Sequence, residues 1–263
     1  MFQDKVVAIT GAQGGIGAAF ARAFTHAGAH VSVSDLAAPQ DIADELGALA
    51  LPCDVTSEAA VDKFIDQTKA ALGPIDIFIA NAGVGFGDPT HAASARNTQW
   101  ETSWQVNVMQ SIYATRALLP SWLERGSGRF VVVASAAGLL NQIGSASYSV
   151  TKAGAIAFAE NFAITHAKAG LKAHAVCPQF VRTDMTAHMK LEEGGPLALK
   201  EPEDVAQALF DAIRDDRFLA LPHEVVAKYH RNKATDRDRW LAGMVQLQDS
   251  MGDQFGLQQF KDG

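Results

Sequence analysis

The sequence predicts an α/β fold in which a doubly wound parallel sheet carries helices on both faces. Short runs rich in β-branched residues alternate with longer segments of helical periodicity along the chain. The strand candidates, 75–80 among them, are apolar at nearly every position, as expected for strands that are buried on both faces. A glycine-rich segment, 11–17, follows the first strand candidate and opens an alanine-rich helix candidate. This alternation requires helical crossovers between parallel strands, which places helices on both faces of the sheet.

The composition is that of a globular protein with a large core. The chain has 263 residues, of which 48% are hydrophobic and 19% are charged. No linker or repeat divides it, so we expect one domain over 1–263, with 223–263 as a C-terminal helical extension. The first apolar run, before Gly11, is too short for a signal peptide or a spanning helix, which predicts a cytoplasmic protein.

The net charge excludes two classes of partner. The formal charge of −7 disfavours binding to nucleic acids or anionic lipids, because their phosphates must be neutralised by lysine and arginine. We therefore expect a small-molecule partner, with no nucleic acid and no membrane. Cys53 and Cys177 lie beside apolar residues at strand ends, without metal-ligand spacing, and predict two buried thiols and no metal site.

The strand candidates are short apolar runs, each followed by turn residues or a helix-length segment. They cover residues 6–10, 31–34, 48–53, 75–80, 130–134, 173–177 and 218–221. Two helices are expected to be long, over 98–123 and 148–169. Apolar residues are spread around the second one, so this helix either packs in the core or also contacts another subunit.

The glycine-rich segment is the first candidate binding site. It lies between a strand and a helix, where glycines allow a tight turn and a close approach of the backbone to a pyrophosphate. Free N–H groups at the helix N-terminus would then meet the phosphate charge. The alternative is a tight turn without a ligand. The candidate cofactor residues here are Gly11, Gln13, Gly15, Ile16 and Gly17.

Asp35 ends the second strand candidate, about 20 residues after the glycine segment, where a dinucleotide fold presents the adenosine ribose. Its carboxylate can accept hydrogen bonds from both ribose hydroxyls and would repel a 2′-phosphate. Neither Gln13 nor Leu36 offers the cation that a phosphorylated cofactor requires, so NAD is expected rather than NADP. The alternative is that Asp35 caps the next helix.

A tyrosine and a lysine, Tyr148 and Lys152, lie one helical turn apart on the same face of a helix candidate. The spacing alone is weak, because Tyr229 and Lys233 repeat it. The first pair differs in its context, since the strand candidate before it delivers Ser135 to its carboxyl end, where open α/β sheets bind ligands. This context favours Tyr148 and Lys152 as the reactive pair.

Together these motifs resemble the short-chain dehydrogenase/reductase family, of the compact type with a Rossmann fold, from about Lys5 to Pro222. Gln179 departs from the family pattern, which has a glycine there, and either narrows the nicotinamide end or hydrogen-bonds the substrate. Further positions match the family pattern after successive strands and in the long helix: Asp54, Val55, Asn81, Ala82, Gly83, Asn107, Pro178, Val181 and Thr183.

The resemblance implies an oxidoreductase that transfers a hydride between NAD(H) and an alcohol or carbonyl compound. Tyr148 would be the acid/base, since a nearby cation lowers a tyrosine pKa, and Lys152 would supply that cation and hold the nicotinamide ribose. Ser135 would orient the substrate oxygen, and Asn107 would keep a water molecule beside Lys152. The segments at 54–55, 81–83 and 178–183 would contact the cofactor. Asp54 could instead be a turn residue, and Asn81 could instead tie neighbouring backbones.

Two other functions compete with this interpretation. A sugar epimerase or dehydratase shares the tyrosine and lysine pair but usually has a larger substrate region, and a non-catalytic NAD-binding sensor would keep only the nucleotide site. The resemblance also implies a homo-oligomer, a dimer or a homotetramer. The substrate is expected to be a small alcohol or ketone, bound in a mostly apolar pocket whose candidate residues are Leu140, Gln142, Gln179 and His188.

The C-terminal extension carries its own helix signal. Thr235 and Asp238 have the spacing of a capping box, which predicts a helix that starts at Thr235. An apolar stripe follows on one face of this helix: Trp240, Met244, Leu247 and Met251. The stripe either packs on its own domain or covers the substrate loop around Gly194 or a neighbouring subunit.

Overall fold

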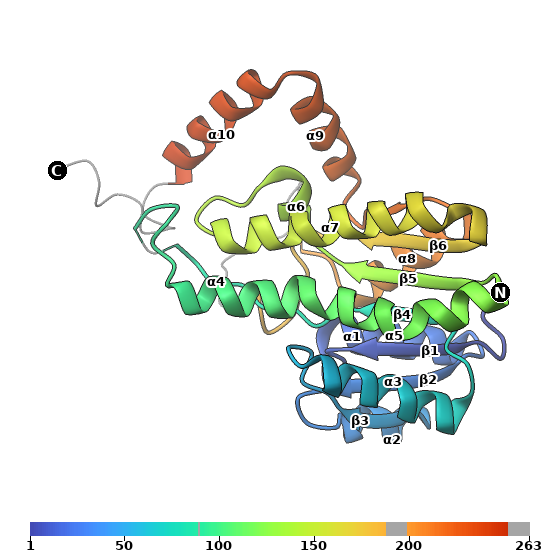
Figure 1. Cartoon of the computed structure of the whole chain (residues 1–263). Helices are drawn as coiled ribbons and strands as arrows, with labels where there is room; N and C mark the ends of the chain where they lie inside the picture. The colour runs from blue at the N-terminus through green and yellow to red at the C-terminus, as the bar shows by residue number, and fades with distance from the viewer. Residues whose placement is uncertain (89, 188–198, 252–263) are drawn as a thin grey trace.

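The computed structural model describes residues 1–88, 90–187 and 199–251. Its centre is a seven-stranded parallel sheet in the order β3-β2-β1-β4-β5-β6-β7 (Figure 1). This confirms the predicted fold class, and each expected strand is present, with ends that shift by one or two residues. The strands are β1 Val6–Thr10, β2 His30–Asp35, β3 Leu49–Pro52, β4 Ile77–Ala80, β5 Gly128–Val133, β6 Leu171–Val176 and β7 Leu219–Ala220.

Helices cover both faces of the sheet. One core contains buried side chains of α1, α2 and α8, and the other contains those of α3, α5 and α7. The helical segments are α1 Gly15–His26, α2 Gln40–Leu46, α3 Glu58–Leu72, α4 Asn97–Trp104, η1 Gln105–Met109, α5 Gln110–Arg125, α6 Ala136–Leu140, α7 Ala146–His166, η2 Ala167–Ala169, α8 Pro202–Arg214, α9 Glu224–Thr235 and α10 Arg237–Met251.

The alternation of side chains along each strand explains why the strands are apolar throughout. Val7 and Ile9 of β1 belong to the core on one face, and Val6 and Ala8 belong to the core on the other. Since successive side chains of a strand point to opposite faces, a strand between two helical layers needs apolar residues at every position.

The first long helix differs from the prediction. Instead of one helix over 98–123, the structure has α4, the π-helical segment η1 and then α5. π-helical turns are frequent at functional sites, and this one contains Asn107. The second long helix begins at Ala146, two residues before its expected start, and its last turn, η2, is a 3-10 helix.

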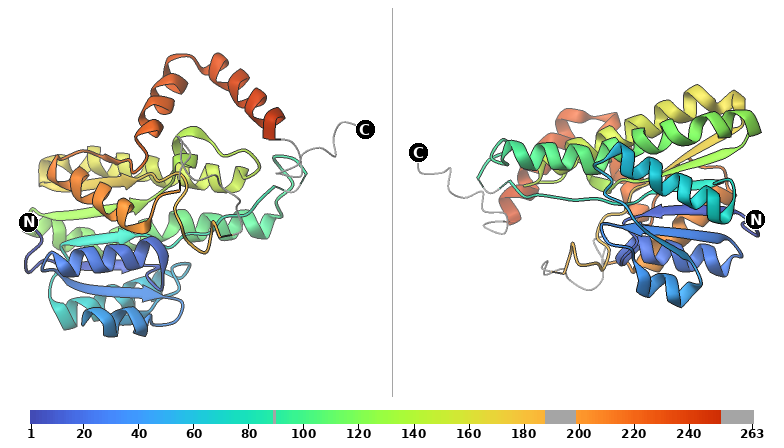
Figure 2. Two further views of the ribbon diagram at one scale, coloured as in Figure 1. Left: turned by 180° about the vertical axis from the view of Figure 1, so that it is seen from behind. Right: turned by 60° about the horizontal axis from the view of Figure 1, so that its bottom comes forward.

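The C-terminal extension forms two helices, α9 and α10, and the first of them was not predicted. The predicted cap at Thr235 is wrong, because Thr235 is still helical in α9 and its hydroxyl donates to the Arg231 carbonyl. Asp236 has the extended backbone of a cap, and its Oδ1 accepts the Arg239 N–H at 2.9 Å. Figure 2 shows the two helices as an arch that projects from the sheet beside α6.

Both cysteines are free and buried, as predicted, and burial raises the pKa of each thiol to about 12. Over the ranges that the structure describes, no helix is both long enough and apolar enough to cross a membrane. The same ranges contain no cluster of three or more histidine, cysteine, aspartate or glutamate side chains placed to hold a metal ion.

Candidate active site

The carboxyl ends of four neighbouring strands bring the predicted site residues together. β1, β4, β5 and β6 are adjacent and parallel, and they end at Thr10, Ala80, Val133 and Val176. The glycine segment, the 81–83 segment, Ser135 and the 178–183 segment therefore meet at one edge of the sheet.

The glycine segment forms a cradle that side chains would fill. Gly11 has a φ of +64°, and a Cβ placed on it would lie 2.6 Å from the Ala82 Cα. A Cβ on Gly17 would meet the Gly11 carbonyl, whereas Gly14 has open space around it. Gly14 is the N-cap of α1 and has no side chain that could bond the N–H groups of the first turn. These N–H groups are therefore open to an anion. These residues fit the pyrophosphate of a dinucleotide.

Asn81 ties the ends of β1 and β4 together. Its Nδ2 donates to the carbonyls of Thr10, at 2.9 Å, and Gly11, at 2.7 Å. The hydroxyl of Thr10 in turn accepts the N–H groups of Asn81 and Ala82. The structural alternative for Asn81 is thus observed, and the same bonds fix the backbone of the 81–83 segment beside the glycine segment.

Asp35 lies against the glycine segment through its carboxylate. Oδ2 accepts the Gln13 N–H at 3.1 Å, and Oδ1 accepts the Leu36 N–H at 2.9 Å. The alternative that Asp35 caps the next helix is wrong, because the cap of α2 is Pro39. Each carboxylate oxygen keeps a lone pair for a further donor, such as a ribose hydroxyl.

Asp54 is a turn residue in this structure, and its Oδ1 accepts both the N–H and the hydroxyl of Thr56. The next side chain, Val55, is buried in one of the two cores. The turn fixes the backbone at the end of β3, and a second oxygen of Asp54 remains for another donor.

Lys152 is buried at the centre of the site, with only 4% of its surface exposed. Its Nζ donates to the Val133 carbonyl at 2.9 Å and lies 5.6 Å from the centre of the Tyr148 ring. A Cβ on Gly83 would lie 3.1 Å from this Nζ, so Gly83 leaves room for the lysine. Burial lowers the pKa of Lys152 to about 8, because the ammonium group loses its hydration.

Tyr148 and Ser135 face each other beside Lys152. Burial raises the pKa of Tyr148, and the nearby side chain of Ser135 lowers it by a smaller amount. The net rise is opposite to the lowering that we expected from cations beside Tyr148. Ser135 also caps α6, since its Oγ accepts the Ala137 N–H at 3.1 Å, and it donates to the Pro178 carbonyl at 3.4 Å. The capping role and the contact with Tyr148 therefore coexist.

Asn107 connects the π-helical turn to the site. Its Oδ1 accepts the Val84 N–H at 3.0 Å, and its Nδ2 donates to the Val84 carbonyl and to the Thr151 hydroxyl. A Cβ on Gly83 would also lie 3.4 Å from this Oδ1, which places Asn107 close to Lys152. The amide thus holds the 83–84 backbone against α7.

The segment after β6 closes the site over the glycine segment. Val181 is buried, and the Thr183 Cγ2 would lie 3.0 Å from a Cβ on Gly15. Thr183 therefore faces the N-terminus of α1. Pro178, whose carbonyl accepts the Ser135 hydroxyl, joins this segment to the catalytic candidates.

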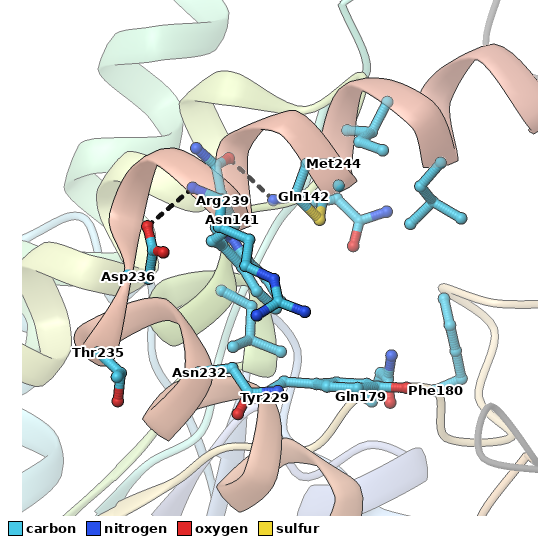
Figure 3. Close-up of a pocket in the computed structure, with 15 residues that line it drawn as sticks. Asn141, Gln142, Gln179, Phe180, Tyr229, Asn232, Thr235, Asp236, Arg239 and Met244 are labelled. Atoms are coloured by element: carbon cyan, nitrogen blue, oxygen red, sulfur yellow. Dashed lines mark hydrogen bonds between the residues drawn. The ribbon is translucent and has the colours of Figure 1, made fainter.

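A cavity of about 680 Å³ is lined by residues that neighbour this centre in the chain, and Ser135, Tyr148 and Lys152 are not among its lining residues (Figure 3). Three of the candidate substrate residues, Leu140, Gln142 and Gln179, line it, while His188 and the loop around Gly194 lie outside the described residues. Gln179 follows Pro178 in the chain. The Gln142 N–H donates to Ser149, the neighbour of Tyr148, at 2.8 Å. Two lining residues are thus linked to neighbours of Ser135 and Tyr148, Gln179 through the chain and Gln142 through this hydrogen bond.

Helices α9 and α10 form the outer wall of the cavity. Trp240, Met244 and Leu247 of the predicted stripe line it, and the side chain of Met251 lies outside the described residues. Tyr229 and Arg239 line it too, and the sequence analysis missed both as pocket residues. Arg239 directly precedes Trp240 of the stripe in the sequence. No local signal, however, indicated that α10 lies at the cavity.

Residues 5–194 match a family model described as short chain dehydrogenase. The chain belongs to the short-chain dehydrogenase/reductase family. It is a dehydrogenase/reductase enzyme with the Rossmann-like fold expected from the resemblance, and an NAD(P) cofactor is typical of this family.

Known members of the short-chain dehydrogenase/reductase family resemble the chain over most of its length. A cis-4-hydroxycyclohexanecarboxylate dehydrogenase of Sinomonas cyclohexanicum is 31% identical over 222 residues, which cover 79% of this chain and 88% of the relative. A crystal structure of a family member from Burkholderia phymatum in complex with NAD has a TM-score of 0.77 at 26% identity and covers 90% of this chain and 95% of its own. A 3-ketoacyl-(acyl-carrier-protein) reductase from Brucella melitensis complexed with NADH has a TM-score of 0.78 at 29% identity, with 84% and 97% covered.

The buried Lys152 predicts a specific pH dependence of stability in this family member. Below about pH 8 the lysine is protonated in both the folded and the unfolded state, whereas between about 8 and 10.5 only the unfolded state keeps the proton. The unfolded state then binds more protons, so the free energy of unfolding gains about 1 kcal/mol per pH unit from this residue. Urea unfolding of the wild type and of Lys152→Met at about pH 7.5, 8.5 and 9.5 measures this gain. The stability difference should move in favour of the wild type with rising pH, and parallel curves would contradict the prediction.

Proposed function

We propose that this chain is an NAD(H)-dependent oxidoreductase that interconverts an alcohol and a carbonyl compound, with Tyr148 as the acid/base. The observation that carries the proposal is the position of the buried Lys152 ammonium group, 5.6 Å from the centre of the Tyr148 ring, with Ser135 close to the same tyrosine. A proton-transferring phenol, a hydroxyl donor and a cation are the groups that removal of a hydroxyl proton requires.

The cofactor, when bound, supplies or accepts the hydride. The residues that would hold it are Gly11, Gln13, Gly15, Ile16, Gly17, Asp35, Asp54, Val55, Asn81, Ala82, Gly83, Tyr148, Lys152, Pro178, Val181 and Thr183. Gly11 to Gly17 would bind the pyrophosphate, and Asp35 would bind the adenosine ribose. The carboxylate of Asp35 favours NAD over NADP, because it would repel a 2′-phosphate.

In the oxidation direction, Tyr148 takes the hydroxyl proton of the substrate as the carbinol carbon loses its hydride. In reduction, the Tyr148 hydroxyl returns the proton to the carbonyl oxygen. Ser135 donates a hydrogen bond to the substrate oxygen and orients the reacting carbon. Lys152 stabilises the phenolate form, and Asn107 holds the backbone beside Lys152, where a water molecule would connect the lysine to solvent.

One assay separates this function from its alternatives. The purified protein is incubated with NAD and a panel of secondary alcohols, and with NADH and the matching ketones, while nicotinamide absorbance is followed. An oxidoreductase changes the absorbance with at least one substrate pair. A sensor binds NADH, as seen by fluorescence, without turnover, and an epimerase converts a sugar nucleotide without net change in NADH. Either result would contradict the proposal.

We also propose that the chain forms a homo-oligomer, a dimer or a tetramer, in which 1–263 act as one domain with 223–263 as its extension. Ile164 and Val150 of α7 and Trp104 of α4 are exposed apolar side chains, with 78%, 49% and 43% of their surfaces accessible. Burial of such side chains between subunits would be favourable.

Deletion of the chain from Ala234 onward is expected to raise the substrate KM about tenfold and to leave NADH affinity within about twofold. The deletion removes Trp240, Met244 and Leu247 from the cavity wall, and each lost apolar contact weakens substrate binding. It retains Lys233, whose Nζ donates to the Leu139 carbonyl at 2.7 Å. Steady-state kinetics, NADH titration and oligomeric mass are compared with those of a shorter deletion of 252–263, which keeps the described lining. If all three quantities remain unchanged, the extension has neither a substrate nor a subunit role.

A further inference from the structure

A single arginine of α10 points into the cavity beside the proposed reacting centre. The close-up shows the Arg239 guanidinium directed between the 141–142 segment on one side and Tyr229 with Gln179 on the other (Figure 3). It is the one cation among the described lining residues. Aromatic and aliphatic side chains, Trp240 and Met244 among them, form much of the wall around it.

The guanidinium of Arg239 has no acidic partner in the described part of the chain. Arg22, Arg116 and Arg182 each pair with a carboxylate, at 2.7 to 2.9 Å, whereas no such ion pair involves Arg239. The carboxylate of Asp236 also lines the cavity, but its Oδ1 accepts the N–H that caps α10. A cation that faces an apolar cavity without a partner is suited to an anionic ligand.

Gln179 also lines the cavity and is linked through the chain to the proposed reacting centre. Gln179 follows Pro178, whose carbonyl accepts the Ser135 hydroxyl. The Oε1 of Gln179 is buried and has no hydrogen-bond partner among the described groups, so it can accept a hydrogen bond from a bound molecule. The cavity therefore has a hydrogen-bond acceptor at Gln179, a positive charge on α10 and apolar side chains in its wall.

We propose that Arg239 is a specificity-determining residue that binds a carboxylate of the substrate, so that the substrates are hydroxy or oxo carboxylic acids with an apolar body. The reacting end of this assignment rests on the proposed function. A planar guanidinium matches a carboxylate through two parallel hydrogen bonds. A phosphate carries a second charge, for which the described lining offers no second cation.

Exposure to solvent limits how strongly Arg239 can bind a carboxylate. Arg239 is exposed in this structure, so water and salt screen its charge. A ligand whose body fills the apolar cavity displaces part of that water and strengthens the charge-assisted bond. We expect the loss of Arg239 to weaken carboxylate binding about tenfold, the lower end for a hydrogen bond to a charged group.

The test uses binding, so that it does not depend on turnover. Isothermal titration calorimetry measures octanoate and its neutral counterpart octanamide against the full chain, with and without saturating NADH. The variants are Arg239→Gln, Arg239→Lys and the matched control Arg237→Gln. The control removes the same charge from the same helix, at a position that lies outside the lining of this cavity.

We expect Arg239→Gln to weaken octanoate binding about tenfold and to leave octanamide within about twofold, with Arg239→Lys between them and Arg237→Gln close to the wild type. Equal octanoate affinity for the wild type and Arg239→Gln would overturn the proposal, as would equal losses in both arginine variants. An equal loss for octanamide would show a packing effect only and would also overturn it.

Turnover separates this proposal from the proposed function. A series of oxo acids and their methyl esters is assayed with NADH, and Arg239→Gln should lower kcat/KM for the acids about tenfold more than for the esters. Octanoate binding that depends on Arg239, in a protein that turns over no alcohol or ketone, would support the anion site and contradict the oxidoreductase. Turnover of neutral ketones with octanoate binding independent of Arg239 would do the reverse.

Discussion

Replacement of Tyr148 by phenylalanine is expected to lower kcat by about 10² to 10⁴ while NADH affinity stays within about twofold. The ring and its packing remain, and only the hydroxyl group with its transferable proton is lost. Stopped-flow measurement of a single turnover, together with an NADH fluorescence titration, separates the chemical step from binding.

The other two tyrosines provide the controls for this prediction. The Tyr113 hydroxyl donates to Gln105 at 3.2 Å, and Tyr229 lines the cavity beside α10. Tyr113→Phe should leave all rates near those of the wild type. Tyr229→Phe can change the substrate KM but should leave the chemical step intact, because its companion Lys233 bonds the Leu139 carbonyl. Near-normal single turnover in Tyr148→Phe would sink the assignment of the acid/base.

The raised pKa of Tyr148 bears on its protonation state in the proposed reaction. A raised pKa favours the phenol over the phenolate, and the phenol is the form that donates a proton when a carbonyl is reduced. In oxidation, the same residue must first become a phenolate, for which Lys152 and the oxidised nicotinamide supply the positive charge.

Asp35→Ala is expected to shift the ratio of kcat/KM for NADP over NAD upward by about 10- to 100-fold. The variant loses hydrogen bonds to the ribose hydroxyls, which weakens NAD binding, and it loses the repulsion of a 2′-phosphate. The change should appear as a higher KM for NAD and a lower KM for NADP, with kcat nearly constant. Initial rates with each cofactor at a saturating concentration of one substrate measure both effects.

Asp41→Ala is the matched control for the cofactor prediction. Asp41 lies in the first turn of α2, and its replacement removes the same charge six residues further along the chain. The control should leave the cofactor preference unchanged. A wild-type protein that prefers NADP, or equal shifts in the two variants, would refute the role of Asp35.

The position of the proposed nucleotide half of the site could be predicted from the sequence because each of its parts is local. The glycine segment follows β1, Asp35 ends β2 and Ser135 lies two residues after β5, and a parallel sheet brings the carboxyl ends of its strands to one edge. The local sequence pattern was therefore enough to predict that these residues lie together at one edge of the sheet. The sequence pattern did not reveal the π-helical turn at Asn107. The hydrophobic pattern of the helix continues on both sides of this turn, and the turn itself only adds one residue to it.

The substrate half could be predicted only in part. Leu140 ends α6, Gln142 follows α6 and Gln179 follows β6. The sequence predicted all three as pocket residues, and all three line the cavity. The apolar stripe of α10 was also visible in the sequence, but its partner surface was not. The helix that positions it, α9, is held by a contact such as Lys233 to Leu139, whose residues are 94 apart in the sequence.

The sequence by itself thus determined the sheet, the glycine cradle and the identities of the catalytic candidates, because local periodicity and turn chemistry encode them. Only the tertiary structure decided that Arg239 and Trp240 lie at the cavity, that Asp236 begins α10, and that burial raises the pKa of Tyr148. These properties depend on contacts and desolvation between segments that are distant in the chain, and no window of neighbouring residues contains both partners.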